Sequence, residues 1–125
     1  NDLVKSCDYL SIHCVLTDET YRIIDKEQFK LMNNVKLINT SRGQTINQDE
    51  LINAINNGNI ESAALDVTDP EPPDYKSSLV THPKILITPH LGSGSRYTFN
   101  KMAEMAALNI INVFSNKKMP SEIVP

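Results

Sequence analysis

Four short hydrophobic runs are spaced along the chain, and polar or helical sequence separates each from the next. Their apolar positions are mostly continuous and do not alternate with polar ones, as is typical of strands buried on both faces of a parallel sheet. Only the first run departs from this pattern, because it contains the polar residues Ser11 and His13. We interpret His13 as an ordinary residue within the strand. We therefore predict four strands: YLSIHC (9–14), VKLIN (35–39), SAALDV (62–67) and ILIT (85–88).

Three further segments have apolar residues at helical spacing. The segments 25–32 and 47–58 lie between predicted strands, and the second begins with a suitable N-cap, Asn47, and ends at Gly58. A longer helix is predicted over 95–114, capped by a serine of the GSGS segment. Its apolar stripe consists of Phe99, Met102, Ala103, Ala106, Ile110 and Phe114.

The alternation of strands and helices predicts an α/β fold with right-handed crossovers. The segment 68–84 is rich in proline, so we predict a loop there with at most one short helix. The chain contains no internal repeat, no low-complexity segment and no sign of an interior domain boundary. Four strands with flanking helices and a long C-terminal helix are therefore the expected architecture.

Composition narrows the class of protein. The chain has 125 residues, 40% of them hydrophobic and 22% charged, which is ordinary for a globular domain. A net charge of -3 gives no reason to expect nucleic acid or a membrane surface as partner. No apolar run approaches the roughly 18 residues that span a bilayer. Cys7 and Cys14 are too few for a disulfide scaffold, so we predict reduced thiols and a cytoplasmic protein.

Four polar residues follow successive predicted strands. Arg42 follows the second strand, and His90 follows the fourth. Asp66 stands at the end of the third strand and Glu71 in the loop after it. Ligands of open parallel sheets bind outside the carboxyl ends of the strands, where these residues would gather. Each residue alone has an ordinary explanation as a turn, capping or surface residue. Their joint placement favours a site.

Such a set suits one kind of chemistry. Arginine binds a carboxylate at two points, and a histidine can exchange a proton near neutral pH. A neighbouring carboxylate favours the charged imidazolium and orients the ring. A substrate with a carboxylate beside a carbonyl or hydroxyl would use all three groups, and hydride transfer needs such an acid. No HExxH or paired Cys-x-x-C motif favours a metal, and no G-x-S-x-G elbow favours a nucleophile.

These residues lie in motifs that resemble those of the D-isomer-specific 2-hydroxyacid dehydrogenases. SCDYLSIHCVLTDET resembles the family's S-D-hydrophobic-H-x-P-L-T-x-x-T, and LINTSRG to DVTDPEP resembles its N-x-x-R-G to D-V-x-x-x-E-P signature. ITPHLGSGS resembles its T-P-H-hydrophobic-G segment. Within the family, DVTDPEPP and MPSEIVP look most like the glyoxylate/hydroxypyruvate reductases.

The resemblance implies half of a doubly wound, Rossmann-like sheet and an activity that moves a hydride between NAD or NADP and a small 2-oxo or 2-hydroxy acid. Its catalytic residues would be Arg42 for the substrate, His90 as acid–base and Glu71 as the partner of His90. No metal is implied. Cofactor-binding residues would be Cys14, Val15, Thr40, Asp66 and Gly92.

The family's G-x-G-x-x-G turn and its substrate domain are not in this sequence. We therefore expect residues 1–125 to be the C-terminal portion of an NAD(P)-binding domain, inactive alone, within an enzyme that is a homodimer at full length. Two alternatives stay open: a non-catalytic, corepressor-like module of the same ancestry, and an unrelated α/β signalling domain.

Overall fold

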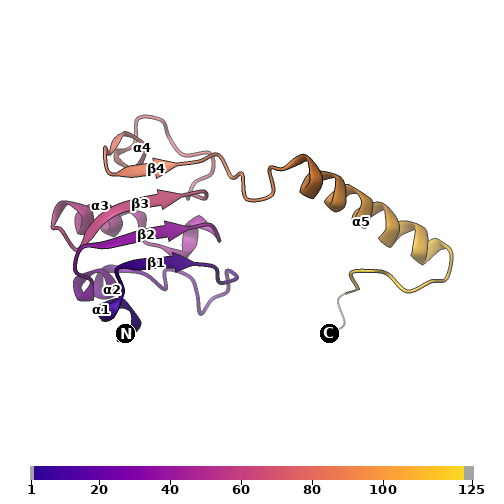
Figure 1. Ribbon diagram of the computed structural model, residues 1–125, viewed down its shortest axis with the longest axis horizontal. Coiled ribbons are helices and arrows are strands. Elements are labelled where there is room, and N and C mark those ends of the chain that lie inside the picture. The colour runs from indigo at the N-terminus through magenta and orange to yellow at the C-terminus, as the bar shows by residue number, and fades with distance from the viewer. Residues whose placement is uncertain (1, 123–125) are drawn as a thin grey trace. The chain divides into compact units, whose positions relative to one another are not determined.

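A computed structural model describes residues 2–122 (Figure 1). The first half of the described chain contains α1 (Asp2–Ser6), β1 (Tyr9–Ile12), α2 (Lys26–Leu31), β2 (Val35–Asn39) and the 3-10 helix η1 (Gly43–Thr45). The second half contains α3 (Gln48–Asn56), β3 (Ile60–Leu65), α4 (Ser78–Thr81), β4 (Ile85–Ile87) and α5 (Arg96–Phe114).

The four strands form one parallel sheet in the order β1-β2-β3-β4. All their arrowheads point the same way in Figure 1, so the carboxyl ends meet at one edge of the sheet. The predicted α/β fold with four parallel strands, flanking helices and a long C-terminal helix is confirmed. The single short helix α4 also agrees with the prediction for the proline-rich segment.

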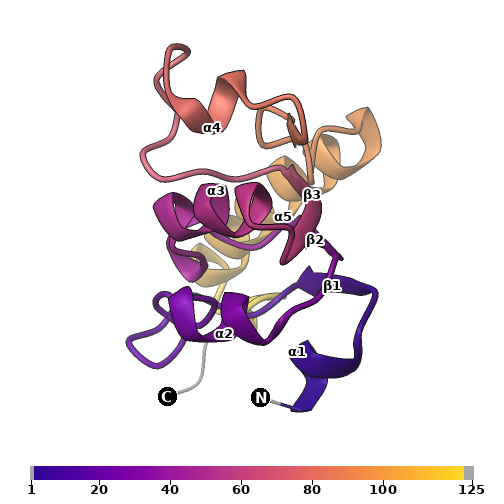
Figure 2. The same ribbon diagram turned by 90° about the vertical axis from the view of Figure 1, so that its left-hand side faces the viewer.

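The hydrophobic core lies between the sheet and the helices α2 and α3, which Figure 2 shows on one face of the sheet. Leu37 of β2 and Leu51 of α3 are essentially inaccessible to solvent. Burial alternates along β1 and β2, and Tyr9 and Leu86 are 63% and 64% exposed. The prediction that the strands are buried on both faces is therefore wrong for these described residues, because α2 and α3 cover one face.

Local signals set the ends of the helices. The Asn47 side chain accepts a hydrogen bond from the Glu50 N–H at 3.3 Å and caps α3, as predicted. Gly58 follows the end of α3 at φ +83°, a conformation that costs glycine little. Asp25 caps α2 through a reciprocal capping box with Gln28.

Three strands end earlier than the hydrophobic runs suggested, and β4 ends at Ile87, one residue before the predicted end. The strand β1 ends at Ile12, so His13 and Cys14 lie beyond it. The interpretation of His13 as a residue within a strand is therefore wrong. The strand β3 spans Ile60–Leu65 and not 62–67, which leaves Asp66 directly after its end. Apolar content could not locate these ends, because loops at the edge of the sheet are also partly apolar.

The chain divides into two compact units, and the second begins at Leu91. The helix α5 belongs to this second unit and is capped by Ser95, whose hydroxyl accepts from the Thr98 N–H at 3.1 Å. None of the residues of α5 is buried, although its sequence has an apolar stripe. The hydrophobic pattern contains no sign of this division.

Both cysteines, Cys7 and Cys14, are free thiols in the structure, as predicted. Among residues 2–122, no helix combines the length and the apolar content that crossing a bilayer requires.

Candidate active site

The side chains of His90 and Glu71 form a hydrogen-bonded pair at the carboxyl edge of the sheet. The Nδ1 atom of His90 lies 2.6 Å from Oε1 of Glu71. Glu71 stands in the loop after β3 and His90 in the loop after β4, so two neighbouring strands deliver the partners. Their side chains are 39% and 47% exposed, which leaves the pair accessible to a small molecule. A carboxylate at this distance fixes the orientation of the imidazole ring.

The backbone at His90 adopts a conformation that few residues tolerate. Its φ is +53°, and its N–H donates to the Thr88 carbonyl at 3.0 Å across a tight turn. A positive φ at a non-glycine residue is uncommon, and such strain concentrates at functional sites. The turn therefore supports a functional role for His90.

A cavity of about 470 Å³ lies beside the His90–Glu71 pair. The Thr88 hydroxyl donates to Oδ1 of Asp66 at 2.5 Å and joins the ends of β4 and β3 across its wall. Apolar walls with a few convergent polar groups are typical of small-molecule sites. The lining residues are Asp66, Thr68, Glu71, Pro72, Pro73, Ile87, Thr88, Pro89 and His90.

A buried polar network shapes the turn that carries Arg42. Asn39, at the end of β2, is 1% exposed and donates from Nδ2 to the Arg42 carbonyl at 3.0 Å. The Thr45 hydroxyl donates to the same carbonyl at 2.7 Å, and Oδ1 of Asn39 accepts from the Ser41 N–H at 3.0 Å. The Arg42 backbone is thus fixed by buried groups. Its guanidinium donates to the Ser41 carbonyl at 2.7 Å.

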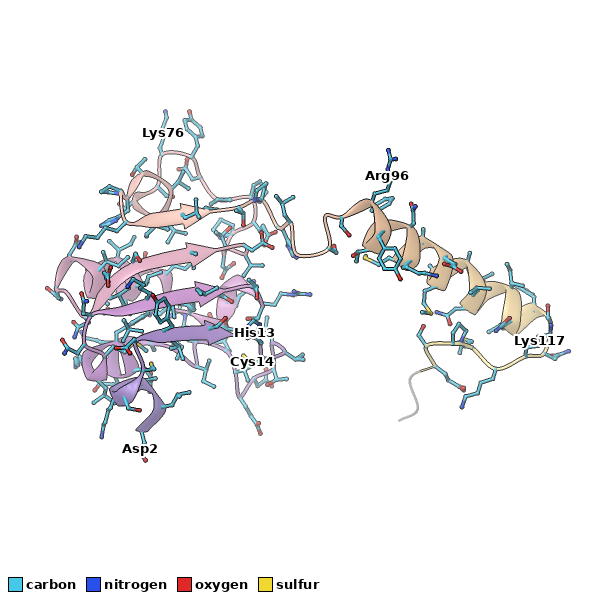
Figure 3. The ribbon with its side chains drawn as sticks, in the orientation of Figure 1. Asp2, His13, Cys14, Lys76, Arg96 and Lys117 are labelled. Atoms are coloured by element: carbon cyan, nitrogen blue, oxygen red, sulfur yellow. The ribbon has the colours of Figure 1, made fainter. Side chains whose placement is uncertain are left out.

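Arg42 lines a second hollow, of about 320 Å³, and not the cavity beside His90. His13 connects the ends of β1 and β2 there, since its Nδ1 contacts the Thr40 hydroxyl at 3.3 Å. Its Nε2 contacts the Ser11 hydroxyl of β1 at 2.7 Å. Figure 3 shows His13 and Cys14 at the carboxyl end of β1. The residues of this hollow are His13, Cys14, Val15, Leu16, Thr40, Ser41 and Arg42.

The predicted site residues of the first unit thus fall into two groups. Asp66, Glu71 and His90 share one cavity, while Arg42 and three of the predicted cofactor-binding residues, Cys14, Val15 and Thr40, share the other. Gly92 lies in the second unit, and its role stays a prediction. Among the described residues, no cluster of three or more His, Cys, Asp or Glu side chains could hold a metal ion.

Gly43 joins the Arg42 turn to the loop that carries Glu71. A Cβ atom at Gly43 would lie 2.1 Å from the carbonyl carbon of Thr68, far inside van der Waals contact. The two backbones therefore touch, and only glycine fits. The residue pair Arg42-Gly43 in the sequence is the signal for this contact, but the partner segment could not be known from it.

The chain is similar to known proteins over nearly its whole length. Residues 1–92 match the NAD binding domain of the D-isomer specific 2-hydroxyacid dehydrogenases. The glyoxylate reductase/hydroxypyruvate reductase of Mus musculus is 38% identical over 122 residues, which are 97% of this chain and 37% of that protein.

Solved structures agree with this match. A crystal structure of a Thermus thermophilus protein has a TM-score of 0.93 and 38% identity, over 98% of this chain and 40% of that one. An NADPH-dependent glyoxylate/hydroxypyruvate reductase from Sinorhizobium meliloti, in complex with NADP and malonate, has a TM-score of 0.91 and 27% identity, over 98% and 39% of the two chains.

This chain spans less than two fifths of the length of the mouse relative. The family match nevertheless covers most of the chain and both hollows at the carboxyl edge of the sheet. The chain therefore belongs to the D-isomer specific 2-hydroxyacid dehydrogenase family, to its NAD binding domain.

Proposed function

We propose that this chain supplies the acid–base half of an enzyme that transfers a hydride between NAD(P)H and a small 2-oxo or 2-hydroxy acid, such as glyoxylate or hydroxypyruvate. Residues 1–125 would be the C-terminal portion of its NAD(P)-binding domain. The observation that carries the proposal is the 2.6 Å contact between His90 and Glu71 beside a cavity of small-molecule size.

His90 would act as the general acid in reduction. With Nδ1–H donating to Glu71, Nε2 is the nitrogen that faces the proton transfer. When bound, NAD(P)H would be the source of the hydride that the carbonyl carbon receives. The Nε2 proton of His90 then passes to the oxygen as it becomes an alkoxide, which leaves a 2-hydroxy acid and a neutral imidazole. In oxidation the same nitrogen takes the proton back. Glu71 would keep the ring oriented in both directions of the reaction through its contact with Nδ1.

Arg42 would bind the substrate carboxylate, since the planar guanidinium forms two parallel hydrogen bonds with it. To do so, its side chain must turn away from the Ser41 carbonyl that it contacts in this structure. The side chain is exposed and its backbone is held by Asn39, so this rotation needs no movement of the turn.

The chemistry of the second hollow suits part of a dinucleotide. The hydroxyl of Thr40 and the imidazole of His13 supply donors and acceptors for ribose or amide groups beside Cys14 and Val15. Asp66 would contact the cofactor from the cavity that contains His90, and Gly92 from the second unit. The relative from Sinorhizobium meliloti was solved with NADP, which supports NAD or NADP as the cofactor here.

Kinetics of the full-length protein that carries this chain would test the proposal. We expect this protein to reduce glyoxylate or hydroxypyruvate with NADH or NADPH. We also expect it to be cytoplasmic and to be a homodimer in light scattering. Cofactor binding without turnover of any 2-oxo acid would instead indicate a non-catalytic, corepressor-like module. Failure to bind either cofactor would contradict both functions.

A further inference from the structure

Gln48, in the first turn of α3, forms two hydrogen bonds with the backbone of Asp69, one through each end of its side-chain amide. Its Nε2 donates to the Asp69 carbonyl at 2.5 Å, and its Oε1 accepts from the Asp69 N–H at 3.3 Å. The amide is planar and presents its donor and acceptor in a fixed relation. Two such bonds to one residue therefore set both the position and the direction of the loop there.

Asp69 stands two residues before Glu71 in the loop after β3. A second glutamine holds it as well, because Nε2 of Gln44 donates to Oδ1 of Asp69 at 3.3 Å. The Thr68 hydroxyl donates to the Pro70 carbonyl at 2.9 Å and stiffens the same stretch. The segment that leads to Glu71 is thus fixed by side chains from outside the loop.

The helix that carries Gln48 is anchored in the hydrophobic core. Gln48 directly follows the N-cap Asn47, and Leu51 and Ile55 of the same helix are 0% and 2% exposed in the core. Glu71 itself is partly exposed and lies in a loop, so its own surroundings constrain it less than the packed helix constrains Gln48. The core therefore positions Glu71 through α3, the Gln48 side chain and the Asp69 backbone.

We propose that Gln48 is a positioning residue for the Glu71–His90 pair and acts through the backbone of Asp69. The inference rests on the proposed function for its catalytic consequence, but not for its geometry. Without these two hydrogen bonds the loop shifts, and the distance between the Glu71 carboxylate and the His90 imidazole increases. A displacement of about 1 Å in a catalytic constellation costs up to roughly 10²-fold in rate.

Gln48→Leu in the full-length protein removes both hydrogen bonds at similar volume. We expect kcat for reduction to fall by roughly tenfold, less than the loss of a general acid, which is about 10²-fold or more. The KM for the 2-oxo acid should change by less than about twofold, because Arg42 would still bind the carboxylate. Asn53→Leu, an exposed position of the same helix, is the matched control and should leave kcat unchanged.

A double mutant separates positioning from general stability. If Gln48 acts through Glu71, Gln48→Leu should cost little further kcat in a Glu71→Gln background. Gln48→Glu keeps the acceptor for the Asp69 N–H but loses the donor, so its kcat should fall between wild type and Gln48→Leu. Equal losses of kcat in both backgrounds would overturn the inference, even if the melting temperature falls.

A crystal structure of Gln48→Leu gives a readout that needs no activity. We expect Nδ1 of His90 and Oε1 of Glu71 to lie beyond hydrogen-bonding distance. An unchanged separation of 2.6 Å would overturn the inference. An inactive wild-type protein would contradict the proposed function alone, since the crystal structure would still decide the role of Gln48.

Discussion

The imidazole of His90 and the carboxylate of Glu71 meet at 2.6 Å although the two residues lie 19 positions apart in the chain. Parallel pairing of β3 with β4 brings them together, because both strands end at the same edge. Leu65 and Ile87 are partners in the last register position of this pair, so both loops start from the same level. Sheet register thus places a histidine and a carboxylate side by side at one cavity.

Replacing His90 tests the acid directly. In the full-length protein, His90→Gln should lower kcat for a 2-oxo acid by at least roughly 10²-fold, the usual contribution of a general acid. Folding should change little, because the side chain is 47% exposed in a loop. His82→Gln is the control, since His82 lies at the end of α4 outside both hollows. Equal kcat in the two variants would show that His90 only shapes the turn.

Replacing Glu71 by glutamine removes a charge and keeps the shape. Glu71→Gln should leave an active enzyme with a lower kcat for reduction, because a neutral amide holds the His90 ring less firmly than a carboxylate does. Steady-state kinetics measures this loss. Glu61→Gln is the control: Glu61 pairs with Lys36 at 3.0 Å, and this hydrogen bond raises the pKa of Lys36. Equal losses of kcat from both substitutions would argue against the specific pairing of Glu71 with His90.

Arg42 should act mainly on the substrate. Arg42→Ala should raise KM for the 2-oxo acid and also lower kcat if the guanidinium polarises the carbonyl. Arg42→Lys should recover only part of the loss, since an ammonium keeps the charge but not the planar fork. Steady-state kinetics with an uncharged carbonyl substrate provides the control. An effect of the same size on that substrate would contradict carboxylate binding.

Gly43 should prove intolerant of a side chain. Gly43→Ala would place a Cβ 2.1 Å from the Thr68 carbonyl carbon, and relieving such overlap costs about 1–3 kcal/mol of the free energy of unfolding. The displaced Thr68 backbone leads to Glu71, so kcat should fall as well. Gly58→Ala is matched in chemistry but has open space around it, and should lower stability through its positive φ without lowering kcat. Urea unfolding and kinetics distinguish the two.

The isolated 125-residue chain should self-associate. The strand β1 forms an edge of the sheet, and Tyr9 on it is 63% exposed. Unpaired edge strands are templates for pairing with another chain. We also expect weak binding of NAD(H) and NADP(H), because the sequence lacks the G-x-G-x-x-G turn that would hold the pyrophosphate. A monomer in light scattering, or micromolar cofactor binding in calorimetry, would contradict these expectations.

The sequence by itself determined the elements, because strand and helix signals are local. Mostly apolar runs located all four strands within two residues at either end, and the Asn47 N-cap and Gly58 located the start and end of α3 equally well. The order of motifs also placed Arg42, Asp66, Glu71 and His90 after successive strands. Periodicity and capping depend on neighbours within a few positions, so they survive in a single sequence.

Only the tertiary structure decided which of these residues meet. It paired His90 with Glu71, placed Arg42 in a different hollow beside Thr40, and moved His13 from a strand to a pocket wall. No sequence motif predicts the hydrogen bonds between Gln48 and Asp69, because they depend on where α3 packs relative to a loop 21 positions away. The local sequence pattern predicts that the strands end at one edge of the sheet. The distances between side chains at that edge depend on strand register, helix packing and the path of each loop.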